Sequence, residues 1–383
     1  MPRSFTAHSS LESLKKEAKH WLKALRTGDS DAHTRFRQVL PTEQGEPGLR
    51  RVQHALALEH GFDGWLALTQ ALADRQLAQR SPAQRAHDFL NAACNDEGTA
   101  AARMLERHPD ISEHDICSAV VSGKLAAVEH WLHKDPTLAS TRGGPKNWEP
   151  LQYLCYARLP VPAASGNAVA VAALLLDRGA DPNAQFKDDW DNPFTLITGV
   201  VAEGEQEEPS HPQAVALARL LIERGADPYQ SQMLYNTSLR HDEVFWLEFF
   251  YDYSAKANTV DRWTARSQWP PSGMMNYLLG NAVSRNHLKR ARWLLERGAD
   301  AQTLHYYAKR KVHTVAQLHG YPDMAALLRS YGATPERFDG YDAFVAACMS
   351  LDSEHARQLV QQHPEFLQHP GPMLEAVGRE RLD

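Results

Sequence analysis

Three histidines close to a pair of tyrosines are the side chains best suited to bind a metal ion. His305, His313 and His319 lie near Tyr306 and Tyr307, and three imidazole ligands can form an open zinc or iron site. Their spacings of eight and six residues do not place them on one face of a helix. We therefore predict no metal and no other cofactor, and keep the three histidines as weak metal candidates only.

Other catalytic patterns carry less weight. The sequence has no Gly-x-Ser-x-Gly motif, no phosphate-binding loop and no dinucleotide-binding glycine fingerprint. Asp188 and Asp189 beside Trp190 could bind a cation or polarise a substrate, but we favour a polar hairpin tip. His130 and His133 are best explained as solvated surface histidines. Enzymatic activity is therefore less expected than binding.

Composition excludes several classes of function. The chain has 41 Lys plus Arg against 47 Asp plus Glu, a net charge of −6, so nothing in its charge favours nucleic acid as a partner. Its four cysteines are widely spaced, as in proteins of a reducing compartment. We find no apolar stretch typical of a signal peptide or of a membrane span. We therefore expect a cytoplasmic protein that does not bind membranes.

The elements that would position these side chains are helices. Residues 10–25 place Leu11, Leu14, Ala18, Trp21, Leu22 and Leu25 at steps of three and four, the pattern of an amphipathic helix. Residues 52–59 and 65–72 predict a second pair of helices. Together these segments predict a small helical leader domain over residues 1–80.

Three later segments end in nearly the same residues. Positions 175–183, 221–229 and 294–302 each combine a helix end, an Arg-Gly-Ala-Asp turn and an extended exit. Repetition of this kind is typical of stacked repeats rather than of one closed core. Inner helices rich in small residues and outer helices ending in paired leucines alternate around these endings. The pattern predicts about eight units over residues 85–383, several degenerate and the last one incomplete.

These units resemble the ankyrin-repeat family. Glu149-Pro-Leu-Gln152 and Asn192-Pro-Phe-Thr195 stand where that family has its Thr-Pro-Leu-His motif, and the Gly-Ala-Asp endings stand where it has its own. The segments 49–65 and 144–156 are also similar to parts of bacterial ankyrin-repeat proteins. The resemblance implies an all-α ankyrin-repeat solenoid, preceded here by the leader. It carries over no catalytic residue.

Two departures from the repeat pattern stand out. Gly179 and Gly225 are 46 residues apart, whereas Gly298 and Gly332 are 34 apart, close to the family period. The longer unit contains the acidic loop 203–209. The unit at 233–253 lacks the Gly-Ala-Asp ending, and the segment 254–273 that follows it contains two tryptophans. Exposed tryptophans there would form a contact surface, whereas buried ones would fill a widened gap.

Aromatic and polar residues at the predicted starts of the units are the binding candidates. In the ankyrin fold these positions face a concave groove, and aromatic residues with Arg and His form binding hot spots. For single aromatics such as Trp148 and Tyr153 the alternative is packing between units. At the unit starts the candidate binding residues are Trp148, Glu149, Tyr153, Tyr156, Arg158, Tyr235, Asn236, His305, Tyr306 and Tyr307. Trp190 at the predicted hairpin tip and His241, Trp263 and Trp269 in the irregular region are further candidates.

We therefore expect a non-catalytic scaffold that binds a protein or peptide through its concave groove. The alternative is a small-molecule-binding or metal-dependent enzymatic pocket in the irregular region 233–313, lined by Tyr235, His241, Trp263 and His305. A third possibility is that the acidic residues 203–208 hold a basic partner.

Overall fold

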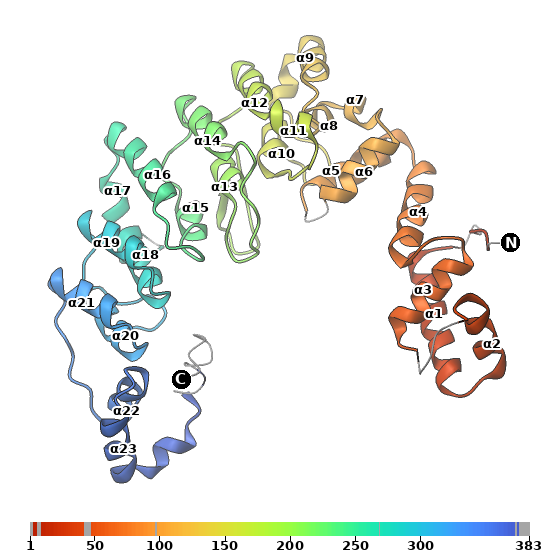
Figure 1. Ribbon diagram of the computed structural model, residues 1–383. Coiled ribbons are helices and arrows are strands. Elements are labelled where there is room, and N and C mark those ends of the chain that lie inside the picture. The colour runs from red at the N-terminus through yellow and green to blue at the C-terminus, as the bar shows by residue number, and fades with distance from the viewer. Residues whose placement is uncertain are drawn as a thin grey trace. The chain divides into compact units, whose positions relative to one another are not determined.

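The computed structural model is mostly helical, with little strand, which agrees with the predicted all-α class (Figure 1). It describes residues 3–5, 9–41, 47–95, 98–267, 269–371 and 374, so most of the predicted incomplete unit at the C-terminal end lies outside the described residues. The contacts divide the chain into two compact units. One comprises residues 1–131, 144–147 and 158–164, and the other comprises residues 132–143, 148–157 and 165–383.

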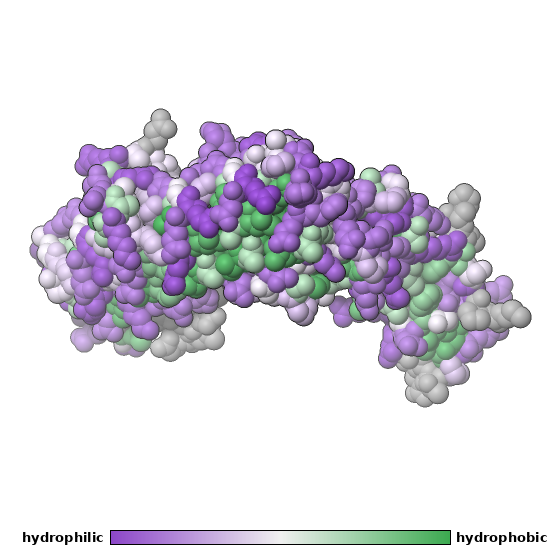
Figure 2. Space-filling model, turned by 90° about the horizontal axis from the view of Figure 1, so that it is seen from above, coloured by the Kyte–Doolittle hydropathy of each residue, from purple (hydrophilic) through white to green (hydrophobic). Residues whose placement is uncertain are grey.

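Apolar side chains reach the surface on several helices, among them α12 (Ala168–Asp177) and α14 (Ala214–Glu223). Helix α12 is apolar along almost its whole length, and Val215 of α14 is 39% exposed. Figure 2 shows apolar surface, in green, between polar residues on the face seen from above. No helix in the described part of the chain is long and apolar enough to cross a membrane.

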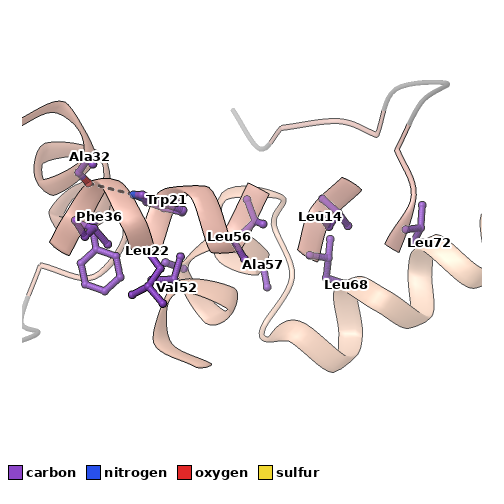
Figure 3. Close-up of a cluster of buried hydrophobic side chains, with 13 residues drawn as sticks. Leu14, Trp21, Leu22, Ala32, Phe36, Val52, Leu56, Ala57, Leu68 and Leu72 are labelled. Atoms are coloured by element: carbon purple, nitrogen blue, oxygen red, sulfur yellow. Dashed lines mark hydrogen bonds between the residues drawn. The ribbon is translucent and has the colours of Figure 1, made fainter. Parts of the chain in front are cut away.

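The first four helices of the chain pack around a core of their own. They are α1 (Leu11–Arg26), α2 (Ser30–Val39), α3 (Leu49–Glu59) and α4 (Trp65–Ala78). Ser10 begins α1 with a capping box to Ser13, and the predicted apolar stripe of this helix is buried except for Leu11. Figure 3 shows the core, in which the Trp21 indole donates a hydrogen bond of 3.2 Å to the Ala32 carbonyl.

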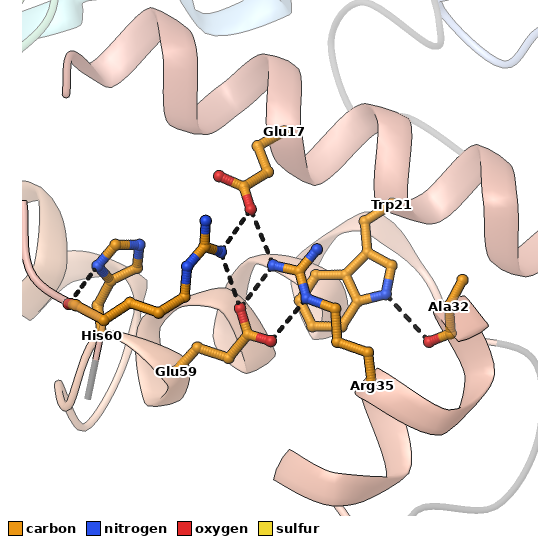
Figure 4. Close-up of polar contacts among 7 residues, drawn as sticks. Glu17, Trp21, Ala32, Arg35, Glu59 and His60 are labelled. Carbon is orange, nitrogen blue, oxygen red and sulfur yellow. Dashed lines mark hydrogen bonds and ion pairs between the residues drawn. The ribbon is translucent and has the colours of Figure 1, made fainter. Parts of the chain in front are cut away.

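A network of four charges lies on this core (Figure 4). Arg35 binds both carboxylate oxygens of Glu59, at 2.6 and 2.5 Å, and reaches Glu17 at 2.8 Å. Arg3 joins the same two carboxylates at 2.6 and 3.2 Å. The Arg35 guanidinium also lies 3.8 Å from the ring centroid of Trp21. Two arginines and two glutamates therefore satisfy one another within the leader.

The remaining helices of the first unit follow at once. They are α5 (Pro82–Ala93), α6 (Gly98–Arg107), α7 (Ile111–His114) and α8 (Ile116–Val121), and α9 (Leu125–Lys134) continues into the second unit. Ser81 and Gln84 form a capping box at the start of α5, with Pro82 at the first helical position. Helix α5 packs against α6, α7 and α8.

In the second unit, one set of helices packs in succession, each against the next. These are α10 (Pro150–Tyr156), α13 (Leu196–Val201), α15 (Ser231–Asn236), α18 (Met274–Ser284), α20 (Val312–Leu318) and α22 (Gly340–Met349). The accompanying second set is α12, α14, α16 (Phe245–Lys256), α19 (Leu288–Glu296), α21 (Pro322–Ser330) and α23 (Ser353–Gln362). Short helices at Pro136–Ala139, Pro162–Gly166, Asp261–Thr264 and Pro364–Gln368 complete the described helices.

The repeated Gly-Ala sequence forms the same helix end each time. Gly179, Gly225, Gly298 and Gly332 have φ values of +92°, +99°, +96° and +92°. Each donates its N–H to the carbonyl three residues earlier, and the following alanine donates to a leucine five residues before it. This is the Schellman arrangement, in which glycine adopts the left-handed conformation without a Cβ clash. The recurrence of the sequence motif therefore has a local physical cause.

Candidate functional site

A cavity of about 500 Å³ in the second unit gathers several of the predicted binding residues. Five parts of the chain form it: a β-hairpin, the loop 203–208, helix α15, the segment before α18 and the loop 304–311. Its lining residues are Asp188, Trp190, Asn192, Phe194, Glu203, Gly204, Glu205, Gln206, Glu208, Gln232, Tyr235, Asn236, Trp269 and Tyr307. We refer to it below as the acidic pocket.

The hairpin presents a tryptophan to solvent. Its strands are β1 (Gln185–Lys187) and β2 (Pro193–Thr195), paired antiparallel. The Asp188 carboxylate accepts hydrogen bonds from the backbone N–H groups of Trp190 and Asn192, at 2.9 and 2.8 Å. Slight burial would raise the pKa of Asp188, but these hydrogen bonds hold it below its usual value. Asp188 thus builds the turn, while Trp190 is left 85% exposed.

The acidic loop between α13 and α14 is held in a fixed conformation. Glu203 and Glu208 form an isolated bridge across it, and Gly204 has a φ of +85°. A Cβ at Gly204 would lie 3.1 Å from Cγ of Asn236, and Asn236 donates a hydrogen bond to the Ala202 carbonyl at 3.1 Å. The loop backbone therefore approaches α15 closely, which places the Glu205 carboxylate beside Tyr235, the aromatic residue of that helix.

The carboxylates of this loop have different surroundings. Glu203 is half-buried, and burial raises its pKa although Arg290 acts against this. Burial lowers the pKa of Arg290 to about 10. Glu207 forms an ion pair with Arg240. The exposed Glu205 accepts a hydrogen bond of 2.5 Å from the Tyr235 hydroxyl.

Five aromatic rings form one wall beside the pocket. The ring centroid of Trp269 lies 6.1 Å from that of Tyr235 and 5.1 Å from that of Tyr277. The hydroxyls of Tyr277 and Tyr307 are 3.1 Å apart, and the rings of Tyr306 and Tyr307 meet edge to face at 4.9 Å. Burial raises the pKa of both Tyr235 and Tyr277, so their hydroxyls remain protonated at neutral pH. Tyr307 is 62% exposed at the rim.

The negative charge of the pocket is compensated only in part, by Arg290 at Glu203. Four of the lining residues are acidic, and no lining residue is Lys, Arg or His. Nearby bases are engaged elsewhere: Arg240 with Glu207, and Lys187 with Asp191 at 2.7 Å. Within the described ranges, no ion pair involves Glu205 or Glu208. The pocket therefore combines exposed aromatic rings with unpaired carboxylates.

A second group of aromatic residues supports the hairpin from behind. The ring of Trp148 stacks on Phe186 of β1 at 4.7 Å, and Phe186 stacks on Phe194 at 5.4 Å. The Tyr156 hydroxyl donates a hydrogen bond of 2.7 Å to the Thr195 carbonyl. Trp148 is only 9% exposed and Tyr153 is fully buried. Their burial favours the alternative considered for these two aromatic residues, packing inside the fold rather than binding. We therefore leave both out of the binding surface.

Other predicted binding residues lie away from the pocket. Trp263 is fully buried, with its ring centroid 5.4 Å from that of Tyr251 and its indole N–H bonded to Ser254 at 3.0 Å. It fills a gap in the core, whereas Trp269 of the same segment lines the pocket. Arg158 belongs to the first unit, where its N–H binds the Ala93 carbonyl at 2.9 Å. The half-buried Glu149 forms a capping box at the start of α10.

The three histidines considered for metal binding do not converge. His305 is buried, its Nε2 lies 2.7 Å from Ser284 Oγ, and its Nδ1 accepts a hydrogen bond from the Ala308 N–H. His313 is fully buried within α20. Burial lowers the pKa of the imidazoles of His305 and His313. His319 packs edge to face on Tyr321 at 5.8 Å. Among the described residues, no three His, Cys, Asp or Glu side chains could together hold a metal ion.

The four residues named for the alternative pocket do not all line the acidic pocket. Only Tyr235 lines the acidic pocket, and His241 is exposed. Several contributors were not predicted from the sequence, among them Phe194 and Gln232, which line the pocket, and Tyr277, which lies behind it. Phe194 follows Asn-Pro at a predicted unit start, which was a usable signal. Tyr277 lies inside a buried helix and gave none.

No protein-family model matches this chain, and no curated protein matches it in sequence.

Proposed function

We propose that this protein is an ankyrin-like repeat scaffold that binds a protein or peptide without catalysis. Two features support the repeat assignment: the succession of packed helices in the second unit and the four helix ends with the same Schellman hydrogen bonds. The motif spacing in the sequence supports it independently. Such a scaffold is suited to binding, because a rigid surface loses little entropy on association.

The observation that carries the binding proposal is the exposure of two aromatic rings on loops held by hydrogen bonds. Trp190 is 85% exposed and Tyr307 is 62% exposed, and both line the acidic pocket. The hydrogen bonds of Asp188 fix the turn that holds Trp190, and the Leu304–Lys311 bridge closes the loop that holds Tyr307. Large exposed aromatic residues on a preorganised surface are the usual anchors of protein interfaces.

Selection from a random peptide library on the immobilised full-length protein tests this proposal. We expect specific peptides on the wild-type protein, and we expect the double variant Trp190→Ala, Tyr307→Ala to lose about 100-fold in affinity, since each aromatic anchor is worth more than about 1 kcal/mol. Tyr331→Ala is the matched control, because Tyr331 is 39% exposed but lies outside the pocket.

Peptides that bind the double variant as tightly as the wild-type protein would place the binding surface elsewhere. A wild-type protein that selects no peptide at all would argue against the scaffold function. Circular dichroism of both variants should match the wild type, because truncation of exposed side chains usually changes stability little.

A further inference from the structure

We infer that the acidic pocket binds the cationic side chain, lysine or arginine, of a basic peptide. This inference rests on the proposed function and specifies the chemistry of the partner. Three properties of the pocket carry it: its exposed aromatic rings, its unpaired carboxylates and its size.

The aromatic rings favour a cation in particular. A ring face attracts an ammonium or guanidinium group that lies within about 6 Å of its centroid. Lys309 already uses this interaction, with its Nζ 4.4 Å from the ring centroid of Tyr306 beside the pocket. Trp190 and Tyr307 have no such cation among the described residues, although both are exposed on the lining of the pocket. Their faces are therefore available to a cation from another molecule.

The carboxylates give the pocket its charge preference. Glu205 and Glu208 line it without any ion pair in the described part of the chain, and the Tyr235 hydroxyl satisfies only part of the hydrogen-bonding capacity of Glu205. An apolar group in the pocket would remove these carboxylates from water without compensation, and an anion would be repelled. A cationic group compensates both costs.

The size of the pocket suits a side chain of a larger ligand. A volume of about 500 Å³ lies within the usual range for small-ligand pockets and exceeds what one lysine or arginine side chain needs. The rest of the volume is open to the flanking backbone of a peptide, for which Gln232 and Gln206 offer amide groups on the lining. The aliphatic part of a lysine or arginine side chain would pack on the aromatic rings, and its charged end would reach the carboxylates.

Fluorine NMR of the full chain labelled with 5-fluorotryptophan tests the inference. The probes are the blocked peptide Gly-Gly-Arg-Gly-Gly, its lysine analogue and an analogue with citrulline, which is nearly isosteric with arginine but neutral. Trp190→Phe and Trp269→Phe assign the two pocket signals. We expect the arginine and lysine peptides to shift both signals and the citrulline peptide to leave them unchanged.

Charge-removing variants complete the test. Glu205→Gln with Glu208→Gln keeps the side-chain shape and should weaken the Kd of the arginine peptide about fivefold. Glu248→Gln, an exposed acid on α16, is the matched control and should leave the Kd unchanged.

Equal shifts with arginine and citrulline would overturn the inference, because shape rather than charge would then govern binding. Absence of shifts with every probe, while library peptides still bind through Trp190 and Tyr307, would also overturn it and leave the proposed function standing. Failure of both the library peptides and the probes would contradict both proposals.

Discussion

The leader and the acidic pocket use the same kinds of side chain in opposite ways. In the leader, Arg35 is bound to two carboxylates and covers the ring of Trp21, which is 4% exposed. In the pocket, Glu205 and Glu208 lack a basic partner within the described residues, and Trp190 is 85% exposed. The leader therefore already contains the cation that the pocket lacks.

This contrast separates charges that stabilise the fold from charges that await a partner. Carboxylates that are bound on several sides by arginine contribute to stability, and removing one partner leaves a partly buried charge uncompensated. Carboxylates on an exposed loop beside aromatic rings contribute little to folding, but they remain available for binding. The same residue types thus acquire their roles from their neighbours.

The two tryptophans should respond to truncation with the largest difference. We expect Trp21→Ala to lower the free energy of unfolding of the leader by about 3 to 5 kcal/mol, the usual cost of removing a buried tryptophan. Trp190→Ala should change stability by less than about 0.5 kcal/mol, because its ring contacts mainly water. Hydrogen exchange of the amides in α1–α3 and in α13 measures the two local stabilities separately.

A similar loss of protection in both variants would mean that the exposed tryptophan is also part of the core. Leu66→Ala is a suitable control in the leader region, since Leu66 is 69% exposed on α4.

Much of the fold could be predicted from local sequence. The Gly-Ala endings were informative because the Schellman turn depends on only about six consecutive residues, so its signal is contained in the sequence itself. The apolar stripe of α1 was predicted for the same reason. The repeat family, by contrast, stays a proposal, and the boundary between the leader and the repeats stays a prediction.

The site was predictable only in part. Trp190, Tyr235 and Tyr307 were identified by type and position, and all three line the pocket. Trp263 and Trp269 could not be distinguished, because they lie in one irregular segment and the burial of Trp263 depends on distant rings. The charge network of the leader was also beyond local reasoning, since Arg35 and Glu59 are 24 residues apart.

The two regions should respond to acid with opposite signs. Partial burial would raise the pKa of Glu17, but hydrogen bonds from Arg3 and Arg35 outweigh it and hold the pKa below its usual value. The stability that Glu17 contributes is therefore present above its unfolded pKa of about 4.3 and is lost as the pH falls through its lower folded pKa. Burial raises the pKa of Glu203, so protonation of this residue favours the folded state.

Between about pH 6 and pH 3.5 we thus expect local stability to fall by about 1 kcal/mol at α1, allowing for solvent exposure, and to rise slightly at α13. Hydrogen exchange corrected for the intrinsic effect of pH measures both. Glu17→Gln and Glu203→Gln should each flatten the response of their own region only. A fall of equal size at both helices would show general acid unfolding and would remove the distinction between the regions.

The smallest expected effect tests whether the carboxylates of the pocket serve the fold at all. Glu205→Gln combined with Glu208→Gln removes two unpaired negative charges from a crowded acidic loop, while the amide oxygen introduced at position 205 can still accept the hydrogen bond of Tyr235. We expect the free energy of unfolding to rise by about 0.5 kcal/mol at low ionic strength, and we expect this gain to vanish at about 1 M salt, where charges are screened within about 3 Å. Thermal denaturation at the two salt concentrations, with Glu248→Gln as the control, provides the measurement.

The leader gives the reference for the opposite outcome. Glu17→Gln should destabilise the leader, because it removes one carboxylate from a network in which both arginines bind it. If the pocket variant were destabilised in the same way, its carboxylates would be structural like those of the leader, and the negative charge that should attract a basic peptide would already be compensated within the fold.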